Sequence, residues 1–194
     1  MRRLAAALVV ATACMLPGSV TAQDAPANAA EVAKARAAIK GLAENLKAAL
    51  VNALQTGGPV AAIEACRTSA PTIAAEQVKA QGVKVGRTAL LVRNPGNAPD
   101  AWERKVLEGF VEKIDAGAAA DTLDQGEVVE IEGRKVFRYM KAIPMAAEPC
   151  MVCHGRDVKP EITAEIAKHY PKDQAVGFNP GKLRGAFTVT VPMN

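Results

Sequence analysis

Aromatic residues are scarce in this chain, and their scarcity limits how its core is built. Only 4% of the 194 residues are Phe, Tyr or Trp, whereas alanine is abundant. The core must therefore consist mainly of Val, Ile, Leu and Ala side chains, and a large flat apolar cofactor would help to fill it. Histidine is also rare: His154 and His169 are the only two, so few nitrogen ligands exist for a metal site.

A strong excess of one charge is also missing. The 24 basic residues only slightly outnumber the 20 acidic ones, and Arg2 and Arg3 lie in an N-terminal segment that we expect to be removed. This balance gives no reason to expect a nucleic-acid or anionic-membrane partner. After the N-terminal segment, no stretch stays apolar for the ~18 residues that a membrane span needs. We therefore expect no membrane span in the mature chain.

The N-terminus has the pattern of an export signal. Met1-Arg2-Arg3 is basic, residues 4–16 are apolar, and residues 19–22 are small, as at a signal-peptidase site. We expect residues 1–22 to be a signal peptide and the mature protein to be soluble and periplasmic or otherwise exported. An uncleaved membrane anchor is the alternative. Residues 23–194 then remain, a length that suits a single domain.

Cysteine is infrequent, and the number of cysteines raises a question. Of the four, Cys14 leaves with the predicted signal peptide unless it carries a lipid anchor. Cys66, Cys150 and Cys153 remain in an oxidising compartment, where thiols normally pair. Three is an odd number, so at least one of these cysteines needs another role.

The first half of the mature chain is predicted to be helical. Apolar residues recur at nearly helical spacing from Glu31 to Leu54, with Lys and Glu between them. The stretch Thr56–Pro59 ends that helix, and a second helix begins at its proline. We expect Pro71 to interrupt the second helix and a further helical piece to run from Thr72 to Gln81.

The second half mixes strands with shorter helices. Val83–Val92 favours a strand, and Asp100 is placed to cap the helix that follows it. Residues 128–143 form a predicted hairpin, residues 162–168 a short helix, and residues 184–192 a final strand. Helices followed by hairpins and scattered strands favour an α+β domain around an antiparallel sheet.

Residues 150–155 read CMVCHG, and this spacing is typical of three kinds of site. A zinc site usually needs four ligands, and only His169 and the distant Cys66 could complete one. A thioredoxin-like pair would open a helix after a buried strand, whereas Ala146–Pro149 predicts a loop. Two cysteines on one turn can instead form thioethers to one porphyrin, which places the next histidine beneath the iron. We therefore expect one covalent haem c on Cys150 and Cys153, with His154 as an iron ligand.

The second axial position of that iron has several candidates. Haem attachment would use two of the three cysteines and leave Cys66 without a disulfide partner in the chain. Cys66 is then either a small buried helix residue or an iron ligand, and the residues alone leave both interpretations open. His169 is expected at the surface, and the methionines are expected in the core: Met140, Met145 and Met193.

Four stretches of the sequence carry a resemblance to a known family. They read AIEACRTSAP (62–71), GRTALLVRNPGNAPDAWE (86–103), CMVCHG (150–155) and VGFNPGKLRGAFTVTVP (176–192), with FRYMKAIPM (137–145) as a supporting strand. In these stretches the chain resembles the Tll-type c-haem domain, a family of exported haem-binding domains of unknown function. The resemblance implies a PAS-like α+β fold, an antiparallel sheet with long N-terminal helices and one covalent haem. It also implies iron ligation by His154 and Cys66.

These features together predict an exported monohaem c-type cytochrome. A thiolate ligand favours ferric iron and lowers the reduction potential, which suits a redox or small-gas sensor module. The alternative is a low-potential electron-transfer cytochrome c. We do not expect an enzyme, because Cys66 would close the iron face that a haem enzyme keeps open. The expected partners are a redox or signalling protein, CO or NO after Cys66 has left the iron, and a second copy of the chain through the long first helix.

Overall fold

The structure, a computed structural model, describes residues 28–193. The predicted signal peptide, residues 1–22, lies outside these residues. Within the described part, no helix is both long enough and apolar enough to span a membrane. The helices and strands follow one another as α1 (Ala29–Gln81), β1 (Lys84–Thr88), η1 (Pro95–Asn97), α2 (Ala101–Asp115), η2 (Ala120–Thr122), β2 (Asp124–Ile131), β3 (Arg134–Pro144), α3 (Met151–His154), α4 (Pro160–His169) and β4 (Leu183–Pro192).

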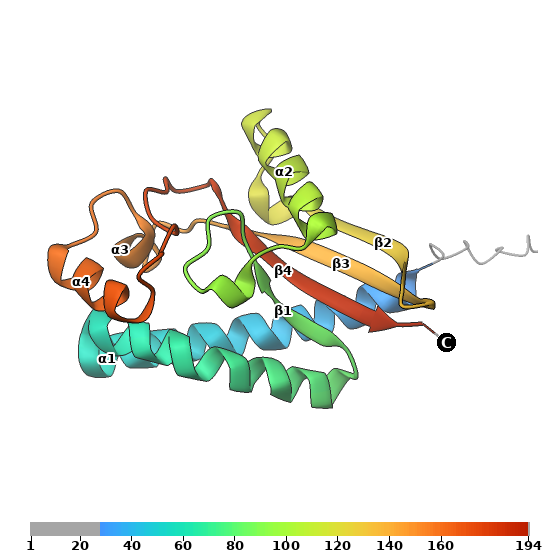
Figure 1. Cartoon of the computed structure of the whole chain (residues 1–194), viewed down its shortest axis with the longest axis horizontal. Helices are drawn as coiled ribbons and strands as arrows, with labels where there is room; N and C mark the ends of the chain where they lie inside the picture. Colours follow the sequence, from blue (N-terminus) through green and yellow to red (C-terminus); the bar gives the residue numbers. More distant parts are fainter. Residues whose placement is uncertain (1–27, 194) are drawn as a thin grey trace, which may run out of the picture.

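Helix α1 is a hairpin of two long antiparallel arms (Figure 1). The chain reverses at Gly58, whose φ of 67° lies in the left-handed region that favours glycine. This confirms the predicted end of the first helix at Thr56–Pro59. The arms pack closely, because a Cβ on Gly41 would clash with the side-chain amide of Gln77.

The predicted interruption at Pro71 is wrong, because the second arm continues through this residue to Gln81. A proline inside a helix removes one backbone hydrogen bond and disturbs the preceding turn. Tertiary packing maintains the helix here, since Ile73 and Ala74, just after the proline, pack with Leu46 against the main core. Helical structure in proteins depends more on such packing than on local propensity.

The four strands form one antiparallel sheet in the order β1-β4-β3-β2. This confirms the predicted α+β class and antiparallel sheet. The predicted hairpin is present as β2 and β3, which turn through Glu132 and Gly133 with φ of 51° and 74°. The final strand is also confirmed, whereas β1 ends at Thr88 and is shorter than the predicted Val83–Val92.

Helices pack against both faces of the sheet. The α1 hairpin covers one face and α2 lies on the other. The cluster under α1 consists of Ala35, Ala38, Ile39, Leu42, Val83, Val85, Phe137, Tyr139, Val189 and Val191. The cluster under α2 consists of Val106, Leu107, Phe110, Met140, Ala142 and Ala186. Asp100 caps α2 as predicted, since its side chain accepts from the Glu103 amide at 2.9 Å.

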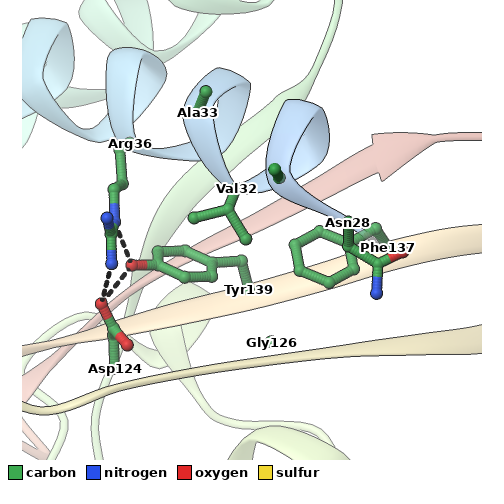
Figure 2. A pocket seen from close by; sticks show the side chains of 9 residues that line it. Asn28, Val32, Ala33, Arg36, Asp124, Gly126, Phe137 and Tyr139 are labelled. Atoms are coloured by element: carbon green, nitrogen blue, oxygen red, sulfur yellow. Dashed lines mark hydrogen bonds and ion pairs between the residues drawn. The ribbon is translucent and has the colours of Figure 1, made fainter. Parts of the chain in front are cut away.

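A pocket with a mostly apolar lining and one polar cluster lies where the start of α1 meets β2 and β3 (Figure 2). Arg36 donates to Asp124 at 2.8 Å and to the Tyr139 hydroxyl at 3.0 Å, and that hydroxyl donates to Asp124 at 2.6 Å. The three polar groups therefore satisfy one another. This pocket is at the opposite end of the molecule from α3 and α4, which lie near the turn of the α1 hairpin (Figure 1).

Gly185 marks a close approach of β4 to β1. A Cβ at this position would meet the backbone oxygen of Thr88 at 2.5 Å, and a backbone atom cannot move aside as a side chain can. We expect Gly185→Ala to destabilise the fold by roughly 2 kcal/mol, as overpacking a filled site does. Gly86→Ala is the matched control, because its new Cβ would meet nothing closer than the Thr188 methyl at 4.0 Å. Equal urea midpoints for the two variants would refute this close approach.

Candidate functional site

The CMVCHG motif forms a single helical turn. Cys150 has helical dihedrals at the start of α3, and its carbonyl accepts from the amides of Cys153 and His154 at 3.3 and 3.1 Å. Cys150 and Cys153 are both free thiols. Since residues three apart on a helix share a face, the turn presents the two thiols together.

Cys66 comes to this turn from the second arm of α1. Ile63, one helical turn earlier, is buried against Ile162 and Ile166 of α4, and Cys153 packs against the same cluster. Cys66 is a free cysteine whose side chain reaches solvent, although the protein atoms around it still partly desolvate its thiol. Desolvation raises its pKa, the charges of Arg87 and Arg93 oppose this rise, and Cys150 adds to it. The fold thus places Cys66 within electrostatic range of the motif, although 84 positions separate it from Cys150 along the chain.

His154 presents one ring nitrogen that is free to act as a ligand. Its Nδ1 lies 2.6 Å from the carbonyl oxygen of Ala175, and because a carbonyl only accepts, Nδ1 carries the proton. The unprotonated Nε2 therefore keeps its lone pair. Burial lowers the pKa of His154 to about 3, and the positive charges of Arg184 and Arg93 act in the same direction. The ring of Phe178 lies edge-on to the imidazole, with 6.4 Å between centroids.

The segment around residues 175–178 supports the motif from one side. The amides of Gly177 and Phe178 donate to the carbonyls of Gly155 and His154 at 2.9 and 3.1 Å. Ala175 and Phe178 also pack with Met145 in a small cluster, which Cys150 and Met151 contact. Both backbone and side-chain contacts therefore fix the position of the turn that holds the two thiols and the imidazole.

Three arginines lie around the motif, and two of them give it a positive charge that no acidic side chain in the described residues neutralises. Arg93 pairs with Asp173 at 3.0 Å, whereas no ion pair within residues 28–193 includes Arg87 or Arg184. Burial lowers the pKa of Arg87, and burial with the neighbouring arginines lowers the pKa of Arg184 to about 10. Arg184 also lies over the ring of Phe178 at 5.5 Å. Such a region favours a bound group with negative charge.

The other residues that the sequence offered as iron ligands lie in different parts of the fold. His169 ends α4, 3.5 Å from Glu165, and its ring lies beside that of Tyr170. Met140 is buried in the cluster under α2, and Met193 packs against the cluster under α1. Met145 is the methionine that lies in the motif's own cluster. The structure thus brings Cys66 and Met145 to the motif, and leaves Met140 and Met193 in the core clusters of the sheet.

The chemistry of this donor set fits a haem. Residues 28–193 contain no group of three or more His, Cys, Asp or Glu side chains that could hold a metal ion. A haem iron has a different requirement, since the porphyrin supplies four ligands and the protein at most two. Cys150 and Cys153 offer two free thiols on one turn, His154 offers a neutral imidazole, and Cys66 offers a third thiol nearby.

Some residues of the site were not found from the sequence. Ala175 acts through its backbone carbonyl. Every residue type has this group, so the sequence gives no sign of the role. Asp173, the partner of Arg93, lies in a stretch with no recognisable motif. Phe178 lies within one of the stretches that carry the family resemblance, so that stretch could have pointed to it.

Comparisons with known proteins give a consistent result. The family described as "Tll0287-like: Tll0287" matches the sequence over residues 19–192. Among solved structures, the crystal structure of the cyanobacterial heme-protein Tll0287 is similar, with a TM-score of 0.62 and 27% sequence identity. The match covers 87% of this chain and 98% of that one. No curated protein matches the chain.

Proposed function

The chain belongs to the Tll0287-like family, and we propose that it is a monohaem c-type cytochrome that serves as a redox or small-gas sensor module. The observation that carries the proposal is the arrangement at α3. Two free thiols share one helical turn with a neutral histidine, and a third thiol approaches from α1. The related protein is described as a heme-protein, and a bound haem would explain why these side chains lie together.

Each residue of the site has a distinct role in this proposal. Cys150 and Cys153 would hold the haem through thioether bonds, and the Nε2 of His154 would bind the iron. Cys66 would be the second protein ligand of the iron, as a thiolate. The haem, when bound, supplies one-electron chemistry between ferric and ferrous iron. With His154 and Cys66 both bound to the iron, no site for an enzyme's substrate would remain there.

The unpaired arginines have a natural role next to such a group. A haem carries two propionates, and Arg87 and Arg184 are partly buried cations with no acidic partner within residues 28–193. Partly buried charges are costly unless they are paired. In this proposal the two guanidinium groups therefore neutralise the propionates. Arg67 lies outside this role, because it pairs with Glu64 at 2.7 Å on the exposed surface of α1.

Cys66 is the residue that would make the protein a sensor. A thiolate stabilises ferric iron and thus lowers the reduction potential, whereas the ferrous form holds it less tightly. In the reduced protein Cys66 would be held less tightly and would take a proton from solvent. The position it vacates would accept CO or NO. The change would be read by a separate redox or signalling protein, and the PAS-like fold implied by the family agrees with such a role.

The remaining parts of the proposal concern location and assembly. The N-terminal pattern of residues 1–22 supports export to the periplasm, where covalent haem attachment takes place. The long α1 hairpin offers a surface for a second copy of the chain. The alternative function, a low-potential electron carrier, needs the same haem but no change of ligand.

A spectroelectrochemical titration of the purified haem protein separates the sensor from the carrier. For the sensor, we expect a low reduction potential, slow reduction and a ferrous spectrum that changes further when CO is added. For the carrier, reduction would be fast and fully reversible, and CO would leave the ferrous spectrum unchanged. The second result would refute the sensor proposal while leaving haem binding intact.

A further inference from the structure

Arg93 and Asp173 form a largely buried ion pair beside the motif. Arg93 lies in the loop after β1 and Asp173 in the loop after α4, and their side chains are only 14% and 11% exposed. The Arg93 Nε donates to Asp173 at 3.1 Å, and its Nη2 lies 3.0 Å from the same carboxylate oxygen. Charged side chains are rarely buried to this extent unless they are paired, as these two are.

The pair reaches the backbone on both sides of the site. The Nη2 of Arg93 donates to the carbonyl of Cys153 at 2.6 Å and, at 3.3 Å, to that of Ala175. Asp173 accepts from the Ala175 amide at 2.8 Å through its other oxygen. One arginine thus ties the haem-attachment turn to the loop that follows α4, and the aspartate fixes the same loop from the amide side.

The carbonyl of Ala175 connects this pair to His154. It is the atom that accepts the hydrogen bond from the imidazole Nδ1 at 2.6 Å. We propose that Arg93 and Asp173 are positioning residues for His154: they fix the Ala175 carbonyl, and through it the ring orientation and donor strength of the imidazole. This inference rests on the proposed function, because it concerns the histidine as an iron ligand.

Physical chemistry explains why this contact matters to the iron. A hydrogen bond from Nδ1–H to a fixed carbonyl gives the imidazole partial anionic character and strengthens it as a donor to a metal. A looser carbonyl weakens that bond, allows more than one ring orientation and favours ferrous over ferric iron. A lysine cannot replace Arg93 in this role, because one ammonium group lacks the planar fork that reaches several acceptors at once.

The test compares Arg93→Lys with Arg156→Lys in the haem-loaded protein. Arg93→Lys retains the positive charge and removes the fork, so an altered potential cannot come from lost charge. Arg156 is the matched control, because it lies two residues after His154, is exposed, and makes no hydrogen bond or ion pair within residues 28–193. The covalent thioethers keep the haem bound in both variants. Asp173→Asn is a second variant, which breaks the pair from the other side.

Three readouts separate positioning from a purely structural role. For Arg93→Lys and Asp173→Asn, we expect a higher reduction potential and a broadened or split low-spin signal in ferric electron paramagnetic resonance. We also expect amide exchange at Gly177 and Phe178 to become roughly tenfold faster or more, since local opening is governed by such contacts. Arg156→Lys should match the parent protein in all three.

The positioning role and the proposed function fail on different results. Faster exchange with an unchanged potential and resonance signal would show that the pair only stabilises the loop, and would overturn the inference. Unchanged values in all three readouts would also overturn it. A parent protein that carries no haem under conditions of active haem attachment would refute the proposed function itself, and the inference would fall with it.

Discussion

Replacing both Cys150 and Cys153 with alanine is expected to reduce covalently bound haem to background. The two thiols lie on one helical turn and are free, so each can form a thioether with the same porphyrin. Without them, haem is held only by coordination and by packing against the arginines and apolar side chains of the site. Acid–acetone extraction, which removes non-covalent haem, followed by the intact mass of the protein, measures the result.

Cys66→Ala is the matched control for this experiment. It also removes a free thiol from the site, but this thiol comes from helix α1 and lies outside the attachment motif at α3. We expect this variant to retain its haem through extraction. Haem that remains covalently bound to the double alanine variant, or haem that is lost from the Cys66→Ala protein, would contradict the assigned roles.

Cys66→Ser is expected to raise the reduction potential and to change the ferric spectrum. A serine hydroxyl is a much weaker donor to iron than a thiolate, so the ferric state loses its main stabilisation. We expect a rise on the order of 0.1 V or more, because axial ligands move haem potentials over a range of about 0.8 V. The substitution should change the folding stability little, since the side chain is exposed in α1.

Met145→Leu tests, by the same two measurements, whether Met145 and not Cys66 binds the iron. Met145 is the methionine that packs in the motif's own cluster, and it is 1% exposed. Leucine has a similar volume, so the core should tolerate it with a cost of less than about 1.5 kcal/mol. We expect its potential and ferric spectrum to match the parent protein. If Met145→Leu shifts the potential and Cys66→Ser does not, methionine is the ligand and the assignment of Cys66 is wrong.

Much of the fold follows from short-range signals in the sequence. The Gly58 turn, the Asp100 cap and the β2–β3 hairpin depend on a few neighbouring residues, and the structure contains all three. Pro71 misled the prediction, because packing between the two arms of α1 outweighs a local helix breaker. The strand order β1-β4-β3-β2 depends on long-range pairing, which residue patterns along the chain do not encode directly.

The residues of the candidate site also differ in whether a local sequence pattern or only the folded chain reveals them. Cys150, Cys153 and His154 are recognisable because the haem attachment that we propose would require them at this fixed spacing. The part played by the Arg93–Asp173 pair was out of reach, since 80 positions separate these two residues and the acceptor that joins them to His154 is a backbone carbonyl. Cys66 is intermediate: the odd cysteine count marks it, but only the folded chain brings it towards the motif.

The central claim is that one iron is held between His154 of the attachment turn and Cys66 of the α1 hairpin. X-ray absorption at the iron edge of the ferric protein, purified after expression with active haem attachment, tests this claim most directly. We expect a single sulfur neighbour among the nitrogen neighbours of the iron, and the loss of that sulfur in Cys66→Ser. A protein without iron, or an iron with only nitrogen or oxygen neighbours, would contradict it.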